Sequence, residues 1–408
     1  TEYTSIGGAS VLNELTDVTM DATNFANGLL IQPDSDGSAP STGTLSSASD
    51  NIGIGRDVFN ALTSGSENYV IGSLAGYSIT SGTKNILMGK QAGEDITTDT
   101  GNTILGYRAG MNITSDYNVA IGYSALQGNA STALTGDHNV AIGYQTLSSV
   151  EAASIGNVAI GRDALKDVTT SDYNVAIGYE AGKSITTGAY NVAIGYRALD
   201  ALTTNGYNVA VGYGALGACT TFNNVAVGGD AGRALTSGIQ NTFVGYATGY
   251  YATTGNANTF LGYGAGDNVT DGANNTLVGV TAGGAINTGT DNIMLGRNAG
   301  DNLTSGDNNV IIGAIDADSA TADDQLIIAS GDGGVTWIKG NSSGGINSKA
   351  EVVAVSGNTT LTLAQTGSYA YWTAGTLTLP ASGTVGTQYT VINNTGGSAT
   401  VAVNASNC

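Results

Sequence analysis

One histidine, two cysteines and a set of carboxylates are the side chains of this 408-residue chain that could do covalent or metal chemistry. His138 has no second histidine to join it, and a zinc site or a catalytic triad needs further ligands or partners. Cys219 and Cys408 make no disulfide framework, and Cys219 stands where a small buried hydrophobic residue is expected. The sequence therefore predicts no enzyme, no catalytic residue, no metal site and no cofactor.

The carboxylates have the chemistry of calcium ligands and of a glycan-cleaving pair. They cluster at Asp34, Asp36, Asp316, Asp318, Asp323 and Asp324. None of these clusters has the spacing of a calcium loop. A glycosidase needs two carboxyl groups about 5 to 9 Å apart across a groove. Most acidic residues fall instead at predicted turns, such as Asp95, Asp167, Asp267 and Asp301. We expect solvated acidic loops, with glycan cleavage as a remote alternative.

A short repeat positions His138, Cys219 and the carboxylates at the predicted turns. An Asn followed four residues later by Gly occurs sixteen times between Asn51 and Gly313, and eleven of the fifteen intervals are 17 residues. Asn174-Val-Ala-Ile-Gly178 is the clearest example. Because this period is too short for a helical hairpin, each unit is predicted to be one coil of a parallel β-solenoid. Sixteen coils stacked about 4.8 Å apart predict a rod roughly 75 Å long.

Each position of the coil, counted from the Asn as zero, has its own predicted role. Position three is a large aliphatic residue and position one is mostly Val or Ile, so the period-two rule puts both on one face, which we expect to be the inside. Position eleven supplies a second inward residue, and Ala at position seven suits a tight corner. The stacked Asn side chains are predicted to hydrogen-bond along the axis.

Position two is then expected to point outward, although it is apolar in almost every coil. A strand that is apolar on both faces is buried on both faces. Neighbouring copies of the chain are therefore predicted to cover position two around a symmetry axis, although surface alanine could also simply be tolerated. The predicted inter-chain contact residues are Ala120, Ala176, Ala193, Ala210, Phe243 and Phe260.

Tyrosine recurs at position five of the coil, which predicts aromatic ladders along the shaft. The residues are Tyr107, Tyr123, Tyr144, Tyr179, Tyr196, Tyr213, Tyr246 and Tyr263. Packing between coils or between chains is one interpretation of these ladders. Sugar binding is the other, because a flat ring with a hydroxyl suits the face of a glycan.

The pattern changes at both ends of the repeat. Residues 1–49 are predicted to be an N-terminal attachment segment and linker, 50–313 the shaft, and 314–346 a cap or collar. Residues 347–408 contain six alternating runs typical of a small antiparallel β-sandwich. Within this last part, Tyr369, Tyr371 and Trp372 stand outside any ladder and are candidate receptor-binding residues.

Charge and hydropathy limit the partners. The net charge of −20 argues against nucleic acid, which needs a basic surface. No apolar run is long enough to cross a bilayer, so no membrane insertion is expected. The chain begins at Thr1 without a signal-peptide pattern, which leaves release by cell lysis and prior removal of a leader both open.

The phrase Asn-Val-Ala-Ile-Gly, found at Asn118, Asn139, Asn157, Asn174 and Asn191, resembles the repeat of the left-handed parallel β-roll head of trimeric autotransporter adhesins. Other phrases are more similar to bacteriophage tail fibres, particularly those of cyanophages. They are Leu15-Thr-Asp-Val18, Asp323-Asp-Gln-Leu-Ile-Ile328 before Trp337-Ile-Lys-Gly340, and Leu377-Thr-Leu-Pro380 to Tyr389-Thr-Val-Ile-Asn-Asn394. The resemblance implies a left-handed roll, a trimer and an adhesive role.

The repeat pattern predicts an all-β solenoid rod, and the resemblance implies that this rod is a homotrimeric β-roll serving as a non-enzymatic tail fibre, extracellular on the virion. Expected partners are other virion or fibre proteins, bound through the termini, and a host cell-surface glycan or protein. A bacterial trimeric surface adhesin or an extracellular filament subunit, located on the bacterial surface, is the alternative. A glycan-cleaving tailspike is more remote.

Overall fold

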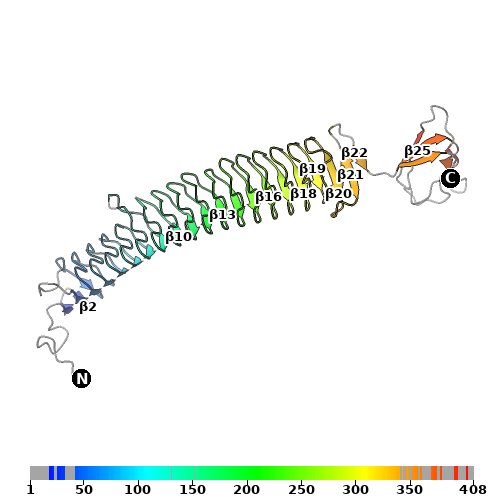
Figure 1. The fold of residues 1–408 in the computed structure, drawn as a ribbon. Helices are drawn as coiled ribbons and strands as arrows, with labels where there is room; N and C mark the ends of the chain where they lie inside the picture. Colours follow the sequence, from blue (N-terminus) through cyan, green and yellow to red (C-terminus); the bar gives the residue numbers. More distant parts are fainter. Residues whose placement is uncertain are drawn as a thin grey trace, which may run out of the picture.

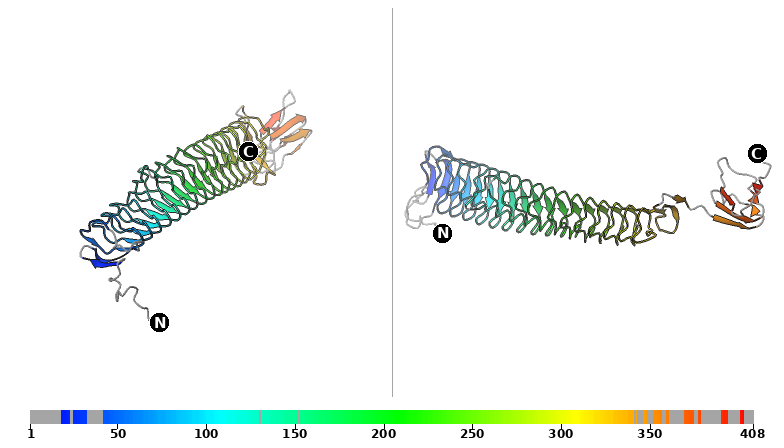
Figure 2. Two further views of the ribbon diagram at one scale, coloured as in Figure 1. Left: turned by 60° about the vertical axis from the view of Figure 1, so that its left-hand side comes forward. Right: turned by 90° about the horizontal axis from the view of Figure 1, so that it is seen from above.

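The computed structural model describes residues 18–22, 25–32 and 42–340 except 130 and 152, Ser342, and the strand residues between 346 and 402. All regular elements in this part are β-strands, and no helix is among them. Between residues 25 and 340 the chain winds into an elongated stack of coils (Figures 1 and 2). The predicted parallel β-solenoid is confirmed.

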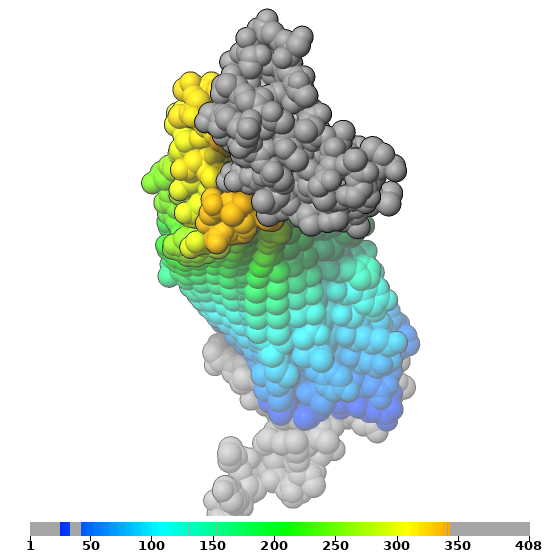
Figure 3. Space-filling view, turned by 90° about the vertical axis from the view of Figure 1, so that its right-hand side faces the viewer, coloured from blue at the N-terminus to red at the C-terminus, as the bar shows by residue number. Residues whose placement is uncertain are grey.

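One strand of three residues marks each of the sixteen predicted coils. These strands are β4 (Ile52–Ile54), β5 (Tyr69–Ile71), β6 (Ile86–Met88), β7 (Thr103–Leu105), β8 (Val119–Ile121), β9 (Val140–Ile142), β10 (Val158–Ile160), β11 (Val175–Ile177), β12 (Val192–Ile194), β13 (Val209–Val211), β14 (Val225–Val227), β15 (Thr242–Val244), β16 (Thr259–Leu261), β17 (Thr276–Val278), β18 (Ile293–Leu295) and β19 (Val310–Ile312). Each pairs in parallel with the next, so that Ala176 lies opposite Ala193, for example. Equivalent side chains therefore form straight columns along the shaft (Figure 3).

The parallel stack is one strand longer at each end than the repeat predicts. At the N-terminal end, β2 (Phe25–Ile31) pairs in parallel with β3 (Ala48–Ser49) and β4, and β1 (Val18–Ala22) is antiparallel to β2. At the other end, β20 (Leu326–Ala329) continues the stack from β19. Antiparallel β21 (Thr336–Gly340) and β22 (Ile346–Ser348) then end it.

Six further strands occur where the alternating runs predict them. They are β23 (Val352–Ser356), β24 (Thr359–Thr360), β25 (Tyr369–Ala374), β26 (Leu377–Thr378), β27 (Thr390–Asn393) and β28 (Val401–Ala402). Their pairing is parallel, in the orders β23-β25-β27 and β24-β26-β28, whereas we expected antiparallel pairs. The loops and side chains that would define a sandwich lie outside the described residues.

The inside and outside of the shaft strand are the reverse of the prediction. Position two points into the coil: Ala120, Ala176, Ala193, Ala210, Phe243 and Phe260 are all 0 or 1% exposed in a single chain. These residues cannot contact another copy, and the predicted inter-chain role is wrong for all six. Positions one and three share a face, as expected, but that face is the outer one. The other inward positions are confirmed, since positions seven and eleven are buried in coil after coil.

Position eight explains how position two can vary between Ala and Phe inside a narrow core. Where position two is large, position eight is glycine in every coil but the last, which has Ile311 and Ala317. A Cβ added at Gly266 would lie 2.6 Å from the ring of Phe260. Where position two is alanine, position eight is usually leucine, as in the pair Ala141 and Leu147, both fully buried. The two positions therefore fill one shared space from opposite walls, consistent with the close packing of protein interiors.

The Asn at position zero forms the predicted ladder. Both the backbone N–H and the side-chain amide of Asn191 donate to Oδ1 of Asn174, at 2.9 and 3.1 Å. The amide of Asn174 in turn donates to the carbonyl of Gly188 at 2.9 Å. Because these groups are buried, each hydrogen bond removes the cost of an unsatisfied polar atom.

Glycine at position four is required by the corner that follows the strand. Gly195 has φ of 133°, a region closed to other residues, and an added Cβ would lie 2.3 Å from the carbonyl oxygen of Gly212 in the next coil. The Asn-to-Gly spacing of the repeat thus joins two structural requirements, the amide ladder and the close approach of successive corners.

Candidate functional site

The outer face of the shaft strands carries two parallel rows of mostly apolar side chains, with threonine at position one in β7, β15, β16 and β17. Positions one and three are half-buried or exposed in every shaft strand, and the position-three side chains of Ile54, Ile177 and Leu295 are 36, 37 and 47% exposed. Sixteen rungs about 4.8 Å apart make this face roughly 75 Å long, and rows two residues apart make it about 7 Å wide. We refer to the position-one and position-three side chains of β4–β19 as the outer apolar face.

The position-five tyrosines stack as predicted. Ring centroids of Tyr179 and Tyr196 are 5.3 Å apart, and those of Tyr196 and Tyr213 are 5.2 Å apart. Arg162 occupies position five where the row lacks a tyrosine, with its guanidinium carbon 5.6 Å from the ring centres of both Tyr144 and Tyr179. The stacking and the cation–π contacts account for the row as packing between coils.

A second column of rings precedes the Asn. Tyr173, Tyr190 and Tyr207 stack with centroids 5.1 to 5.4 Å apart, and His138 stacks on Tyr117 at 5.4 Å. His138 has φ of 62°, like its tyrosine equivalents, and so occupies a turn position of the coil. His138 therefore lies at a surface turn, as its place in the repeat predicts.

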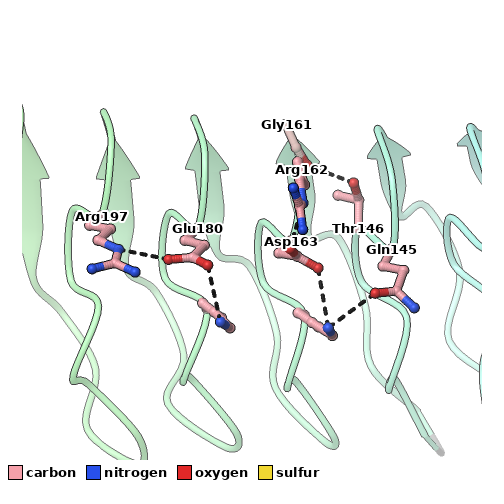
Figure 4. A network of polar contacts seen from close by, with 9 residues as sticks. Gln145, Thr146, Gly161, Arg162, Asp163, Glu180 and Arg197 are labelled. Carbon is pink, nitrogen blue, oxygen red and sulfur yellow. Dashed lines mark hydrogen bonds and ion pairs between the residues drawn. The ribbon is translucent and has the colours of Figure 1, made fainter.

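Ion pairs involve the position-six side chains of successive coils (Figure 4). Arg197 donates to Glu180 at 2.7 Å, and Lys183 approaches the same carboxylate at 3.2 Å. Burial works to raise the pKa of Glu180, but these two cations outweigh it and hold the pKa below its ordinary value. One oxygen of buried Asp163 makes no hydrogen bond and has Lys166 Nζ 3.2 Å away. The carboxylates of this network are neutralised by partners, which suits a structural role.

The remaining carboxylates form no metal site among the described residues, where no group of three or more His, Cys, Asp or Glu could hold an ion. Asp323 accepts the backbone N–H of Asp307 at 2.8 Å, and Asp318 pairs with Lys339. Burial raises the pKa of both Asp267 and Asp301, which approach Gly284 from the coils on either side. Asp34 and Asp36 lie outside the described residues.

Cys219 is a buried free thiol in the core slot at position eleven, as predicted. Burial raises the pKa of this thiol above its ordinary value. A neutral, enclosed thiol is a poor nucleophile, so Cys219 acts as a small hydrophobic residue of the core. Cys408 lies outside the described residues.

A groove with a volume of about 690 Å³ runs along the shaft across successive coils. Its floor and sides are outward residues at positions ten and twelve of successive coils, chiefly Ala234, Tyr251, Thr253, Asn268, Thr270 and Ala285. We call this the shaft groove. The sequence interpretation missed it, although one signal was present: Tyr251 is the single aromatic residue in a position-ten row that is otherwise small or polar.

The structure leaves the other predicted contact residues undescribed. Tyr369, Tyr371 and Trp372 belong to β25, but their side chains lie outside the described residues. No helix in the described part of the chain is long and apolar enough to span a membrane. Comparisons with protein-family models, with curated proteins and with solved structures find no match for this chain.

Proposed function

We propose that this chain is a non-enzymatic fibre protein of a virion, a tail fibre whose β-roll forms a homotrimeric rod for attachment to a host surface. The observation that carries the proposal is the outer apolar face. Its dimensions correspond to an area on the order of 500 Å², and monomers rarely expose a larger contiguous apolar patch. On a chain with a net charge of −20, such a face is best explained as an interface.

A second and third copy of the same chain suit this face. Every copy presents the same rows at the same rise per coil, so apolar side chains meet apolar side chains at each level when the rods lie parallel. Three copies are what the resemblance to β-roll adhesins and tail fibres implies. In this arrangement positions one and three, rather than position two, line the contacts between chains.

Attachment is assigned to the ends of the rod. The shaft repeats one surface every coil, whereas Tyr369, Tyr371 and Trp372 belong to a segment without that repetition. These residues are the proposed contacts to a host cell-surface glycan or protein, and the termini are proposed to bind other virion or fibre proteins. The proposed location is the virion, with no nucleic-acid partner and no membrane insertion.

A bacterial trimeric surface adhesin, or an extracellular filament subunit, is the second candidate. It is favoured by the Asn-Val-Ala-Ile-Gly phrase, which resembles the repeat of the trimeric autotransporter adhesins. An antibody against this chain separates the two: labelling of fibres on purified virions supports the tail fibre, and labelling of uninfected bacteria supports the adhesin. The glycan-cleaving tailspike is a more remote third candidate.

The oligomer is tested by placing charge on the outer apolar face. Ile177→Glu with Ile194→Glu is expected to convert trimers to monomers while the coil remains folded, because carboxylates enclosed in an apolar contact lose their hydration. Thr187→Glu with Thr204→Glu adds the same charge at exposed positions of the same two coils and should leave the trimer intact. Light scattering after size-exclusion chromatography measures the mass. An intact trimer carrying the two isoleucine substitutions would remove the proposed interface.

A further inference from the structure

We propose that the shaft groove binds a neutral, linear polysaccharide that lies along the rod axis. The proposal names a ligand class for attachment, and its biological meaning rests on the proposed function. It places this ligand on the shaft, however, and not on the C-terminal strands. The groove falls within the 300 to 1,000 Å³ range typical of ligand sites.

The lining and its surroundings disfavour an anionic ligand. The groove is formed by alanine, threonine, asparagine and tyrosine side chains, without a charged one, on a chain with a net charge of −20. Asp271 lies beside the lining, and its carboxylate accepts the hydroxyls of Thr253 and Thr254 at 3.1 and 2.7 Å. These hydroxyls help hold the pKa of Asp271 below its ordinary value, so it stays ionised and repels anionic sugars.

One aromatic ring gives the groove a platform. Tyr251 is 53% exposed, and Tyr250 meets its ring edge-on with centroids 4.6 Å apart, which supports the ring from one side. Alanine at 234 and 285, the same position in nearby coils, leaves open space around that ring. A flat ring bordered by open space suits the apolar face of a pyranose.

The polar lining matches sugar hydroxyls. Asn268 donates its amide to the carbonyl of Gly284 at 2.6 Å and to Asp267 at 3.3 Å. Its Oδ1 accepts no hydrogen bond from the described residues and so can accept one from a sugar. The hydroxyl of Thr270 donates to Asn287 in the next coil, which leaves its oxygen to accept as well. Ordered acceptors that need no rearrangement lower the entropic cost of binding.

The direction of the ligand follows from the solenoid. Positions ten and twelve recur at about 4.8 Å along the axis, so polar groups are offered at one spacing over several coils. An extended chain of hexoses presents hydroxyls at a similar repeat. A linear polysaccharide along the axis can therefore meet one coil with each sugar, whereas a compact ligand would use only one rung.

Affinity electrophoresis of the full chain tests the proposal. Native gels contain hydroxyethyl cellulose, laminarin, galactomannan or dextran as neutral probes, and alginate as the anionic control. We expect at least one neutral probe to retard the chain and alginate not to. Tyr251→Ala should weaken that retardation by about tenfold, because the platform is lost. Ala285→Tyr should weaken it too by filling the groove, and the coil tolerates tyrosine at this position, as residue 251 shows.

Tyr196→Ala is the matched control, since it removes an exposed tyrosine from the position-five ladder and should leave retardation unchanged. The proposal is overturned if no neutral probe retards the chain, if alginate retards it, or if Tyr196→Ala abolishes retardation while Tyr251→Ala does not. These results are independent of the light-scattering and labelling tests above. A chain that binds a neutral polysaccharide but is absent from virions and monomeric would refute the tail-fibre proposal alone.

Discussion

Exchanging the large and small residues of one coil tests whether positions two and eight share a space. Leu147 has φ of 50°, so Leu147→Gly relieves a left-handed backbone strain of about 1 to 2 kcal/mol. The same change removes a fully buried side chain, which costs about 3 to 5 kcal/mol with its cavity. The packing loss exceeds the relief, and we expect a net destabilisation of about 3 kcal/mol. Ala141→Leu alone overfills the core and should cost about 2 kcal/mol.

The double variant Ala141→Leu with Leu147→Gly should recover most of that loss. It reproduces the arrangement of Leu277 and Gly283, where the leucine methyls approach within 2.9 Å of the point that a glycine Cβ would occupy. We expect a cost of about 1 to 2 kcal/mol relative to the natural chain, and a coupling energy of about 3 kcal/mol between the two sites.

Native-state hydrogen exchange of peptides covering residues 139–156 measures the free energy of opening of this coil. A local measurement suits a repeat protein, because its coils need not unfold together. All variants are compared at one protein concentration, because self-association shifts apparent stability. If the double variant loses as much protection as the two single losses added together, positions two and eight do not fill a common space, and the packing argument fails.

Two further predictions concern the corner and the ion pairs. Gly195→Ala should cost about 3 kcal/mol or more, seen as a lower denaturant midpoint, because φ of 133° and the carbonyl of Gly212 both oppose a Cβ. Gly331→Ala, where an added Cβ would meet nothing within 4 Å, should change the midpoint little, and equal losses would refute the explanation. For Glu180, a folded pKa below the ordinary 4.5 means stability that is present at neutral pH and lost as pH falls through the folded value. The stability difference between the natural chain and Glu180→Gln should therefore be largest near pH 7 and vanish in acid, and a difference that does not change with pH would contradict the role given to Arg197 and Lys183.

Much of the coil could be predicted from the sequence because each role has its own residue type. Asn at position zero, Ala at position seven and aliphatic residues at position eleven all lie where their chemistry requires. The face of the strand could not be assigned from hydrophobicity, because Val175 and Ile177 are more apolar than Ala176, which lies between them. By hydrophobicity alone, the two larger residues would be placed inside the coil and the alanine outside, which is the reverse of the observed arrangement.

The sequence does contain the information that decides which face of the strand points inward, but it lies six residues further along the coil. Phe243 and Phe260 at position two are accompanied by Gly249 and Gly266 at position eight, whereas Ala141 is accompanied by Leu147. A residue whose size is compensated by another in the same coil must share a core with it. The shaft groove escaped prediction for a related reason: its shape depends on the missing side chains of Ala234 and Ala285, and open space leaves little trace in a sequence.

The corrected assignment of the inner and outer faces of the strand strengthens the case for association between chains. An interface built from position two would have been mostly alanine in the middle coils, with little area to bury per residue. The observed outer face offers mostly Val, Ile, Leu and Met instead, and burying these side chains contributes about 25 cal/mol for every Å² of apolar surface removed from water. The buried alanines let the coil close around a thin core of its own, and the larger aliphatic residues remain available for another chain. One three-residue strand therefore serves both the fold of the single chain and the assembly proposed for it.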